Sequence, residues 1–301
     1  MLNRLLGMWS VAGLTCLMAL VTFALPASAE AVAGQPVDGQ LGLQGAVTPV
    51  AQSIHDFYNL VTYIIIAIAI FVLALMVYVM FAFNEKSNPN PSRVTHNTFI
   101  EVVWTVVPII ILVVIAVPSF KLLHLQYAYP KPDLTIKATG HQWYWSHSYP
   151  DYGDFSFDSY MLDDDGIKER REKGLDAPRN LAVDNDVVVP VGKVVHVLVT
   201  AGDVLHNWTI PSFGSKTDAV PGRLTATWFK AEREGVFYGQ CSELCGVNHA
   251  FMPIAVRVVD QQTFDAWVAA RKEDDEDKAN EIIHKAALEL KSRNKLASAE
   301  H

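Results

Sequence analysis

The chain carries the stretch CSELCGVNHAFM at residues 241–252, which places two thiols, an imidazole and a thioether in one short segment. These are the soft and borderline ligands that copper selects over magnesium, calcium or manganese. Upstream, His206 lies at the edge of a strand-like run and offers a second imidazole from a neighbouring strand. We therefore expect a metal loop built on β-strands, with two Cys, two His and one Met as its donors.

The cysteine pair has two other interpretations. Of the three cysteines in the chain, Cys16 lies in a segment expected to be removed, and two lone cysteines in an oxidising compartment commonly form a disulfide. A structural zinc site would take four Cys and His ligands in a tetrahedron. A disulfide does not require His249 and Met252 at fixed short distances from the cysteines in sequence, and the thioether of Met is not a usual zinc ligand. Copper electron-transfer centres use His, Cys and a weak axial Met, so the pattern favours copper, with two thiolates able to bridge two ions.

Three motifs, at residues 140–145, 206–211 and 240–252, give the chain a resemblance to subunit II of haem-copper cytochrome c oxidase. The resemblance extends from the first apolar run to about Trp267. It implies a two-helix transmembrane hairpin followed by an all-β, cupredoxin-like domain, a Greek-key β-barrel that holds a binuclear copper centre called CuA. The implied ligands of the two copper ions are His206, Cys241, the backbone carbonyl of Glu243, Cys245, His249 and Met252.

The resemblance also assigns roles to single side chains. Trp143 resembles the exposed aromatic residue through which electrons enter the copper centre, and core packing is the alternative. Three consecutive aromatic residues cannot all point inward from a strand, because alternate side chains face opposite ways. Glu101 matches a glutamate at the cytoplasmic mouth of a proton channel into the large subunit, and an interfacial anchor is the alternative. Glu243 is implied to bind Mg²⁺ shared with the large subunit, since Mg²⁺ prefers oxygen ligands; a surface carboxylate is the alternative.

Acidic residues outnumber basic ones by eleven to five between Asp151 and Asp186. An acidic face raises the association rate of a basic partner, and a solvated loop is the alternative. The family's partner is cytochrome c, and Asp184 and Asp203 fall in segments that match its docking face. Asp218 and Arg223 fall in a loop that the resemblance places at the interface with the large subunit.

Uncharged runs predict a membrane hairpin at residues 56–121. No charged residue occurs between Asp56 and Glu85 or between Glu101 and Lys121, and each run is long enough to cross a bilayer. Buried core helices of a soluble protein are the alternative. Residues 1–29 are typical of a secretory signal that is cleaved after a small residue, with a lipidated cysteine as the alternative, and residues 30–55 predict an extended arm.

A translocated N-terminus followed by two crossings returns the remaining chain to the outer side of a bacterial inner membrane. Residues 122–267 contain short β-branched and aromatic runs separated by Pro, Gly and Asp, which predict a periplasmic β-sandwich or barrel. Residues 268–301 predict a charged, helical tail on the surface.

The composition excludes some functions and agrees with an anchored electron carrier. The formal charge is -8 and half of the residues are hydrophobic, so nothing indicates nucleic-acid binding. The chain has no haem-attachment motif and no bundle of intramembrane histidines, so it cannot itself reduce oxygen. The resemblance implies that electrons pass from cytochrome c to haem a of the large subunit, where haem a3 and CuB reduce oxygen and protons are pumped. Membrane lipid and further oxidase subunits are the other expected partners. A nitrous oxide reductase and a copper-delivery protein are the alternatives.

Overall fold

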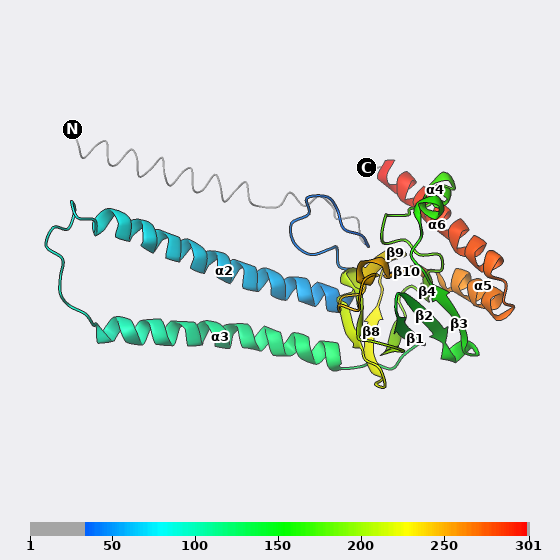
Figure 1. Cartoon of the computed structure of the whole chain (residues 1–301), viewed down its shortest axis with the longest axis horizontal. Helices are drawn as coiled ribbons and strands as arrows, with labels where there is room; N and C mark the ends of the chain where they lie inside the picture. The colour runs from blue at the N-terminus through cyan, green and yellow to red at the C-terminus, as the bar shows by residue number, and fades with distance from the viewer. Residues whose placement is uncertain (1–33, 300–301) are drawn as a thin grey trace.

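The computed structural model describes residues 34–299, and the expected signal at residues 1–29 lies outside them. Two long helices project side by side from a β domain, and further helices cover the opposite end of that domain (Figure 1). The first long helix, α2 (Pro49–Ala82), is followed by α3 (Thr98–Tyr127). Their apolar side chains are exposed along most of their length, as expected for surfaces that face lipid or another subunit.

Each long helix extends past the limits expected from the sequence. Helix α2 begins at Pro49, inside the expected arm, because Thr48 caps its first turn by accepting from the Ala51 N–H and Pro49 suits the first helical position. Helix α3 continues to Tyr127, beyond the expected end at residue 121. The sequence limits rested on the uncharged runs alone, whereas the extra turns contact the β domain instead of lipid.

The expected fold class of a two-helix hairpin followed by an all-β domain is confirmed, with one difference. The described strands form sheets of five, three and two strands, in the orders β3-β2-β1-β5-β8, β4-β10-β9 and β6-β7, rather than one closed barrel. The strands are β1 (Leu134–His141), β2 (Tyr144–Tyr149), β3 (Phe155–Ser159), β4 (Val187–Pro190), β5 (Val194–Ala201), β6 (His206–Ile210), β7 (Ser215–Ala219), β8 (Thr225–Lys230), β9 (Gly235–Gln240) and β10 (Pro253–Val259).

Burial along the strands explains how the sheets pack. Strand β5 alternates between buried and half-buried residues, whereas every residue of β10 is buried. A strand that is buried at every position is covered on both faces. Short helices connect the strands: η1 (Pro150–Tyr152), α4 (Asp164–Glu172), η2 (Pro211–Phe213) and η3 (His249–Phe251).

The C-terminal tail is helical, but it is not confined to the surface. Helix α5 (Gln261–Lys272) begins inside the range expected for the β domain, where its Phe264 and Trp267 are fully buried in the main core. Its last turn belongs to the tail and buries Ala270 in the same core, and α6 (Glu276–Ala299) follows. Ala279 and Ile283 of α6 are buried in the same core. Sequence reasoning missed this packing because the apolar residues are sparse among charged ones, so the helices appear solvated until their partners are known.

One buried carboxylate connects the segment around α4 to the central strand. Asp186 is 1 % exposed and accepts a hydrogen bond from Nε of Arg257 of β10 at 2.8 Å. It also forms an ion pair with Nη2 of the same residue at 2.6 Å, while Arg170 of α4 lies 3.6 Å away. Loss of the carboxylate would leave buried guanidinium charges without a partner, which is strongly destabilising. Asp186 therefore belongs to the interior, although the sequence counts it among the acidic residues of a docking face.

A close approach of two backbones positions the metal loop. A Cβ atom at Gly239 of β9 would lie 1.7 Å from the carbonyl oxygen of Thr209 of β6, so only glycine fits there. Strand β9 ends at Gln240, just before Cys241, and β6 begins at His206. The approach therefore brings together two segments that both carry candidate ligands.

Candidate metal centre

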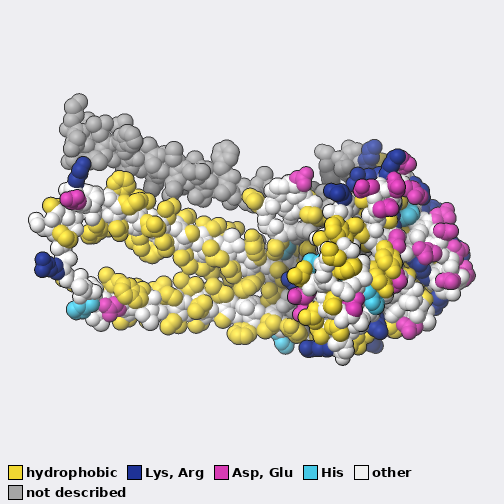
Figure 2. Space-filling model, in the orientation of Figure 1, with side chains coloured by type: hydrophobic (Ala, Val, Ile, Leu, Met, Phe, Trp, Pro, Cys, Tyr) yellow, Lys and Arg dark blue, Asp and Glu magenta, His cyan; other side chains and the backbone are white. Residues whose placement is uncertain are grey.

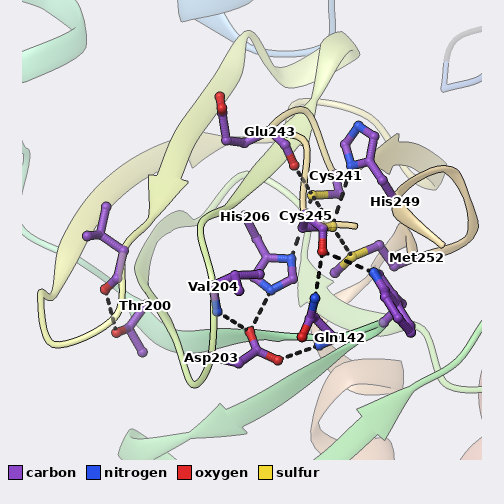
Figure 3. A network of polar contacts seen from close by, with 12 residues as sticks. Gln142, Thr200, Asp203, Val204, His206, Cys241, Glu243, Cys245, His249 and Met252 are labelled. Carbon is purple, nitrogen blue, oxygen red and sulfur yellow. Dashed lines mark hydrogen bonds and ion pairs between the residues drawn. The ribbon is translucent and has the colours of Figure 1, made fainter. Parts of the chain in front are cut away.

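Six candidate donor groups converge beside the ends of β6, β9 and β10 (Figure 3). The Cys241 and Cys245 sulfur atoms lie 3.9 Å apart, and both thiols are free. The Cys241 sulfur lies 3.9 Å from Nδ1 of His206 and 3.3 Å from the carbonyl oxygen of Glu243. The first half of the cluster thus contains one sulfur, one imidazole and one carbonyl oxygen.

The second half of the cluster is arranged around Cys245. Its sulfur lies 3.5 Å from Nδ1 of His249, in η3, and 3.5 Å from the sulfur of Met252. His206 and Met252 are at most 1 % exposed, and both cysteines are buried. These four donors are therefore screened from water, whereas His249 is half-buried, and one imidazole lies next to each sulfur.

The two thiols differ in acidity. Burial raises the pKa of the Cys241 thiol, but contacts with His206 and with backbone groups of Glu243 and Asn207 outweigh burial and lower this pKa below its ordinary value. Burial and the neighbouring sulfur of Cys241 raise the pKa of Cys245. One thiolate therefore forms readily, whereas the second needs a nearby cation. Metal binding supplies that cation and releases the proton.

Asp203 fixes the orientation of the His206 ring. Its Oδ1 lies 2.8 Å from Nε2 of His206, on the side of the ring away from Cys241, and it accepts from the Val204 N–H at 2.6 Å. Its Oδ2 accepts from the Gln142 N–H at 2.7 Å. Burial raises the pKa of Asp203, but these hydrogen bonds outweigh it and lower the pKa. In turn, Cys241 and Asp203 outweigh the effect of burial and raise the pKa of His206.

Trp143 lies against the metal loop, but it is half-buried rather than exposed. It occupies the turn between β1 and β2, and its indole Nε1–H donates to the Cys245 carbonyl at 3.2 Å. The Gln142 side chain donates to the same carbonyl at 2.8 Å. Trp145 is fully buried and donates to the Met252 carbonyl at 3.3 Å. The aromatic motif thus spans a turn, which separates the environments of its two tryptophans.

Sequence reasoning missed two residues that support the cluster. Gln142 lies inside the motif at residues 140–145, but its role becomes visible only in the structure. Its backbone N–H donates to Asp203, and its side chain donates to the Cys245 carbonyl. The spacing of Asp203 and His206 was available as a signal, because a carboxylate near a ligating histidine commonly fixes its ring.

The other predicted site residues lie outside the donor cluster. Asp184 accepts from the backbone N–H groups of Tyr160 and Asn185, both at 2.7 Å. Asp218 of β7 is exposed and accepts from the Asn207 side chain at 2.6 Å, and Arg223 is exposed in the loop that follows β7. The Glu243 side chain is exposed, although its carbonyl faces the cluster.

Glu101 lies in the first turn of α3, at the end of the hairpin farthest from the β domain (Figure 1). Its carboxylate accepts from the Asn97 N–H at 3.2 Å, and the Asn97 side chain accepts from the Ile100 N–H at 3.3 Å. Glu101 thus has a structural role as part of a helix cap. The metal loop and Glu101 occupy opposite ends of the molecule.

The fold and the site together define a membrane-anchored, cupredoxin-like metalloprotein with a thiolate and imidazole centre. Residues 134–259 match the family profile "Cytochrome C oxidase subunit II, periplasmic domain", and residues 36–122 match its transmembrane domain. The chain therefore belongs to the cytochrome c oxidase subunit II family. It is a membrane protein with a periplasmic domain and a subunit of an oxidoreductase complex, and its cluster fits a copper centre.

Known relatives match most of the chain. It is 46% identical to the probable cytochrome c oxidase subunit 2 of Rickettsia bellii over 264 residues, which cover 88% of this chain and 94% of the relative. It is 45% identical to cytochrome c oxidase subunit 2 of Cereibacter sphaeroides over 268 residues, covering 85% and 88%. The solved periplasmic domain of subunit II from Bradyrhizobium japonicum is 56% identical, with a TM-score of 0.44, and the match covers 48% of this chain and 98% of that domain.

We expect Asp203→Asn to lower copper affinity about 10- to 100-fold, because residues that orient a ligating histidine contribute on this scale. Competition with a copper chelator on the purified chain measures the affinity. Asp218→Asn is the matched control, since this exposed carboxylate contacts Asn207 instead of a donor. Equal affinities for wild type and Asp203→Asn would contradict the orienting role.

Proposed function

We propose that the cluster holds two copper ions and relays single electrons from cytochrome c to haem a of the oxidase large subunit. The observation that carries the proposal is the paired arrangement of donors. Two free thiols lie 3.9 Å apart, with His206 next to one and His249 next to the other. Such a pair offers two bridging sulfurs and one terminal imidazole for each ion.

The chemistry of the remaining donors supports copper. The buried thioether of Met252 lies beside Cys245, and the Glu243 carbonyl lies beside Cys241. A weak thioether and a weak carbonyl ligand suit copper electron-transfer centres, whereas structural zinc takes four Cys or His ligands. Bound copper supplies one-electron chemistry. Four of the donor side chains are buried, and the loop that carries most of the donors is held at both ends by β9 and β10, so that little rearrangement accompanies a change of charge.

Electron entry is assigned to Trp143. Its ring lies between solvent and the Cys245 carbonyl, to which it donates a hydrogen bond. The adjacent exposed residues of the metal loop include Leu244 and Val247, at 77% and 83% exposure. An apolar rim around an entry residue suits a transient protein partner. Of the docking carboxylates, Asp203 and Asp184 are proposed to act mainly through their charge, since each already accepts hydrogen bonds within the chain.

The remaining partners are proposed from the exposed residues of the hairpin and of the β domain. The large subunit with haem a, haem a3 and CuB, together with further oxidase subunits and lipid, is proposed to cover the exposed apolar hairpin in a bacterial inner membrane. Asp218 and Arg223 are proposed to meet the large subunit, because both are exposed on the segment that follows the His206 strand. The exposed carboxylate of Glu243 is proposed to bind Mg²⁺ shared with that subunit, and Glu101 to admit protons at the other end of the hairpin.

Removing either thiol tests the copper assignment. We expect Cys241→Ser and Cys245→Ser each to abolish the two-copper mixed-valence EPR signal, because each sulfur is proposed to bridge both ions. Metal analysis should give at most one copper per chain. Ser242→Ala, an exposed position between the two thiols, is the control. A cysteine variant that keeps the signal would sink the assignment, and one exchangeable Cu(I) in the wild type would favour copper delivery.

Removing the indole tests electron entry. We expect Trp143→Ala to lower kcat for cytochrome c oxidation by more than about tenfold, which corresponds to about 1.4 kcal/mol of barrier, while KM changes little. Tyr160→Ala, an exposed aromatic residue, is the control. Steady-state kinetics of the assembled oxidase separate the two constants, and a parallel loss in both would favour a packing role.

Two substitutions separate the proton role of Glu101 from its cap. Glu101→Gln keeps an oxygen that can accept from Asn97, whereas Glu101→Ala removes it. If Glu101 admits protons, both variants should turn over several-fold more slowly with normal copper spectra, because neither side chain can carry the proton. Turnover at the wild-type rate in Glu101→Gln would leave only the structural role.

A further inference from the structure

The start of α2 is joined to the β domain through buried hydrogen bonds. The Val47 N–H donates to the Ser212 carbonyl at 3.0 Å, and the Val47 carbonyl accepts from the Glu232 N–H at 2.9 Å. The Thr48 hydroxyl donates to the Phe213 carbonyl at 2.7 Å while accepting from the Ala51 N–H at 3.0 Å. One side chain thus both caps the membrane helix and fastens it to η2.

Gly214 brings the helix and the β domain into backbone contact. Its φ is +67°, and a Cβ atom there would lie 2.7 Å from Ile54 Cδ1, 3.0 Å from Ala51 Cα and 3.1 Å from the Ala51 nitrogen. The Ile54 methyl group can rotate away, but the two Ala51 backbone atoms cannot, so a methyl group at position 214 would require the helix and η2 to separate by a few tenths of an ångström. Ala51 is 1 % exposed, which leaves no room for a sideways adjustment.

The joint is continuous with the metal cluster. Strand β6 begins at His206 and ends at Ile210, and η2 follows at once with Pro211–Phe213. The Phe213 ring packs against Phe237 of β9, with ring centroids 5.1 Å apart, and β9 leads directly to Cys241. The segments that carry His206 and Cys241 therefore both reach the joint through short, buried connections.

The second membrane helix is fastened at a separate place. The Trp228 indole donates to the Gln126 carbonyl of α3 at 3.1 Å, and the Tyr129 hydroxyl donates to the Ala226 carbonyl at 2.8 Å. His196 Nε2 lies 2.7 Å from the Pro130 carbonyl. Two separate attachments remove the hinge that a single linker would leave. The orientation of the β domain on the hairpin is thereby fixed.

We propose that Gly214 is a positioning residue: the close contact it permits with α2 sets the height and orientation of the metal cluster over the membrane hairpin. This inference rests on the proposed electron relay, because the height matters only if electrons pass to a group in a membrane-embedded subunit. Electron transfer slows steeply as donor and acceptor separate.

The test compares two glycines of similar backbone conformation in the assembled oxidase. Gly192 has φ +72° and no atom within 4 Å of a Cβ at that position, so Gly192→Ala carries the backbone strain without the collision. We expect Gly214→Ala to slow electron transfer from the photoreduced copper centre to the large subunit's haem about twofold or more, which corresponds to about 0.4 kcal/mol of barrier. KM for cytochrome c and the copper EPR spectrum should stay at wild-type values, and Gly192→Ala should match the wild type throughout.

A second pair of variants keeps the test decisive if Gly214→Ala does not assemble. Thr48→Val removes the hydroxyl that binds the Phe213 carbonyl, whereas Thr48→Ser keeps it. Slower internal electron transfer in Thr48→Val, restored in Thr48→Ser, supports the positioning role. An unchanged internal rate in Gly214→Ala, or in Thr48→Val where the former is absent, overturns it. Absence of electron transfer from the cluster in the wild type would instead contradict the proposed function.

Discussion

The contact between the backbones of β6 and β9 is the constraint on which the metal cluster depends. His206 and Cys241 are far apart in sequence, and their donor atoms lie 3.9 Å apart only because Gly239 lets β9 approach the Thr209 carbonyl. The large side chains of the core pack around this contact: Trp208 of β6 is stacked on Phe229, and Phe213 lies against Phe229 and Phe237. Since protein interiors are close-packed, these rings resist any movement that would separate the two strands.

Burial of the cluster has an electrostatic cost that the surrounding residues offset in different ways. Burial and the neighbouring sulfur of Cys241 raise the pKa of Cys245, whereas contacts with His206 and with backbone groups outweigh burial and lower the pKa of Cys241. His206 lies between the Cys241 sulfur and the Asp203 carboxylate. That carboxylate also accepts hydrogen bonds from the Gln142 and Val204 N–H groups, which stabilise its negative charge. The metal-free protein is thus prepared for cations without carrying the full charge of both thiolates.

The sequence predicted those features that short segments determine. The two apolar runs and the metal loop each lie within a few dozen residues, so composition and spacing were enough to identify the hairpin and five donor side chains. The Glu243 carbonyl was named only from the family resemblance. What it could not predict depends on contacts between distant segments. The early start of α2 depends on Thr48 meeting Phe213, and the insertion of Trp267 into the core depends on aromatic partners such as Tyr149. The hydrogen bond from Gln142 to Asp203 likewise appears only when the turn after β1 meets the segment before β6.

The acidic segment shows that the number of carboxylates in a sequence differs from the number that are free at the surface. Between Asp151 and Asp186, several carboxylates are occupied within the chain: Asp163 caps α4, Asp151 binds the Thr135 N–H and Asp158 binds Ser146. Asp186 is paired with buried arginines, so little of its charge reaches solvent.

A carboxylate that accepts a hydrogen bond from a neutral N–H keeps its charge, however, and the long-range field that steers a basic partner needs only that charge. Acidic side chains also gather at the end of the β domain away from the hairpin (Figure 2). The field of this segment is therefore suited to attracting a basic protein from a distance. In the proposed electron relay, final contact with the donor protein is assigned instead to the apolar rim of the metal loop, where Leu244 and Val247 are exposed. Attraction and contact are thus assigned to different parts of the molecule, and salt weakens the first much more than the second.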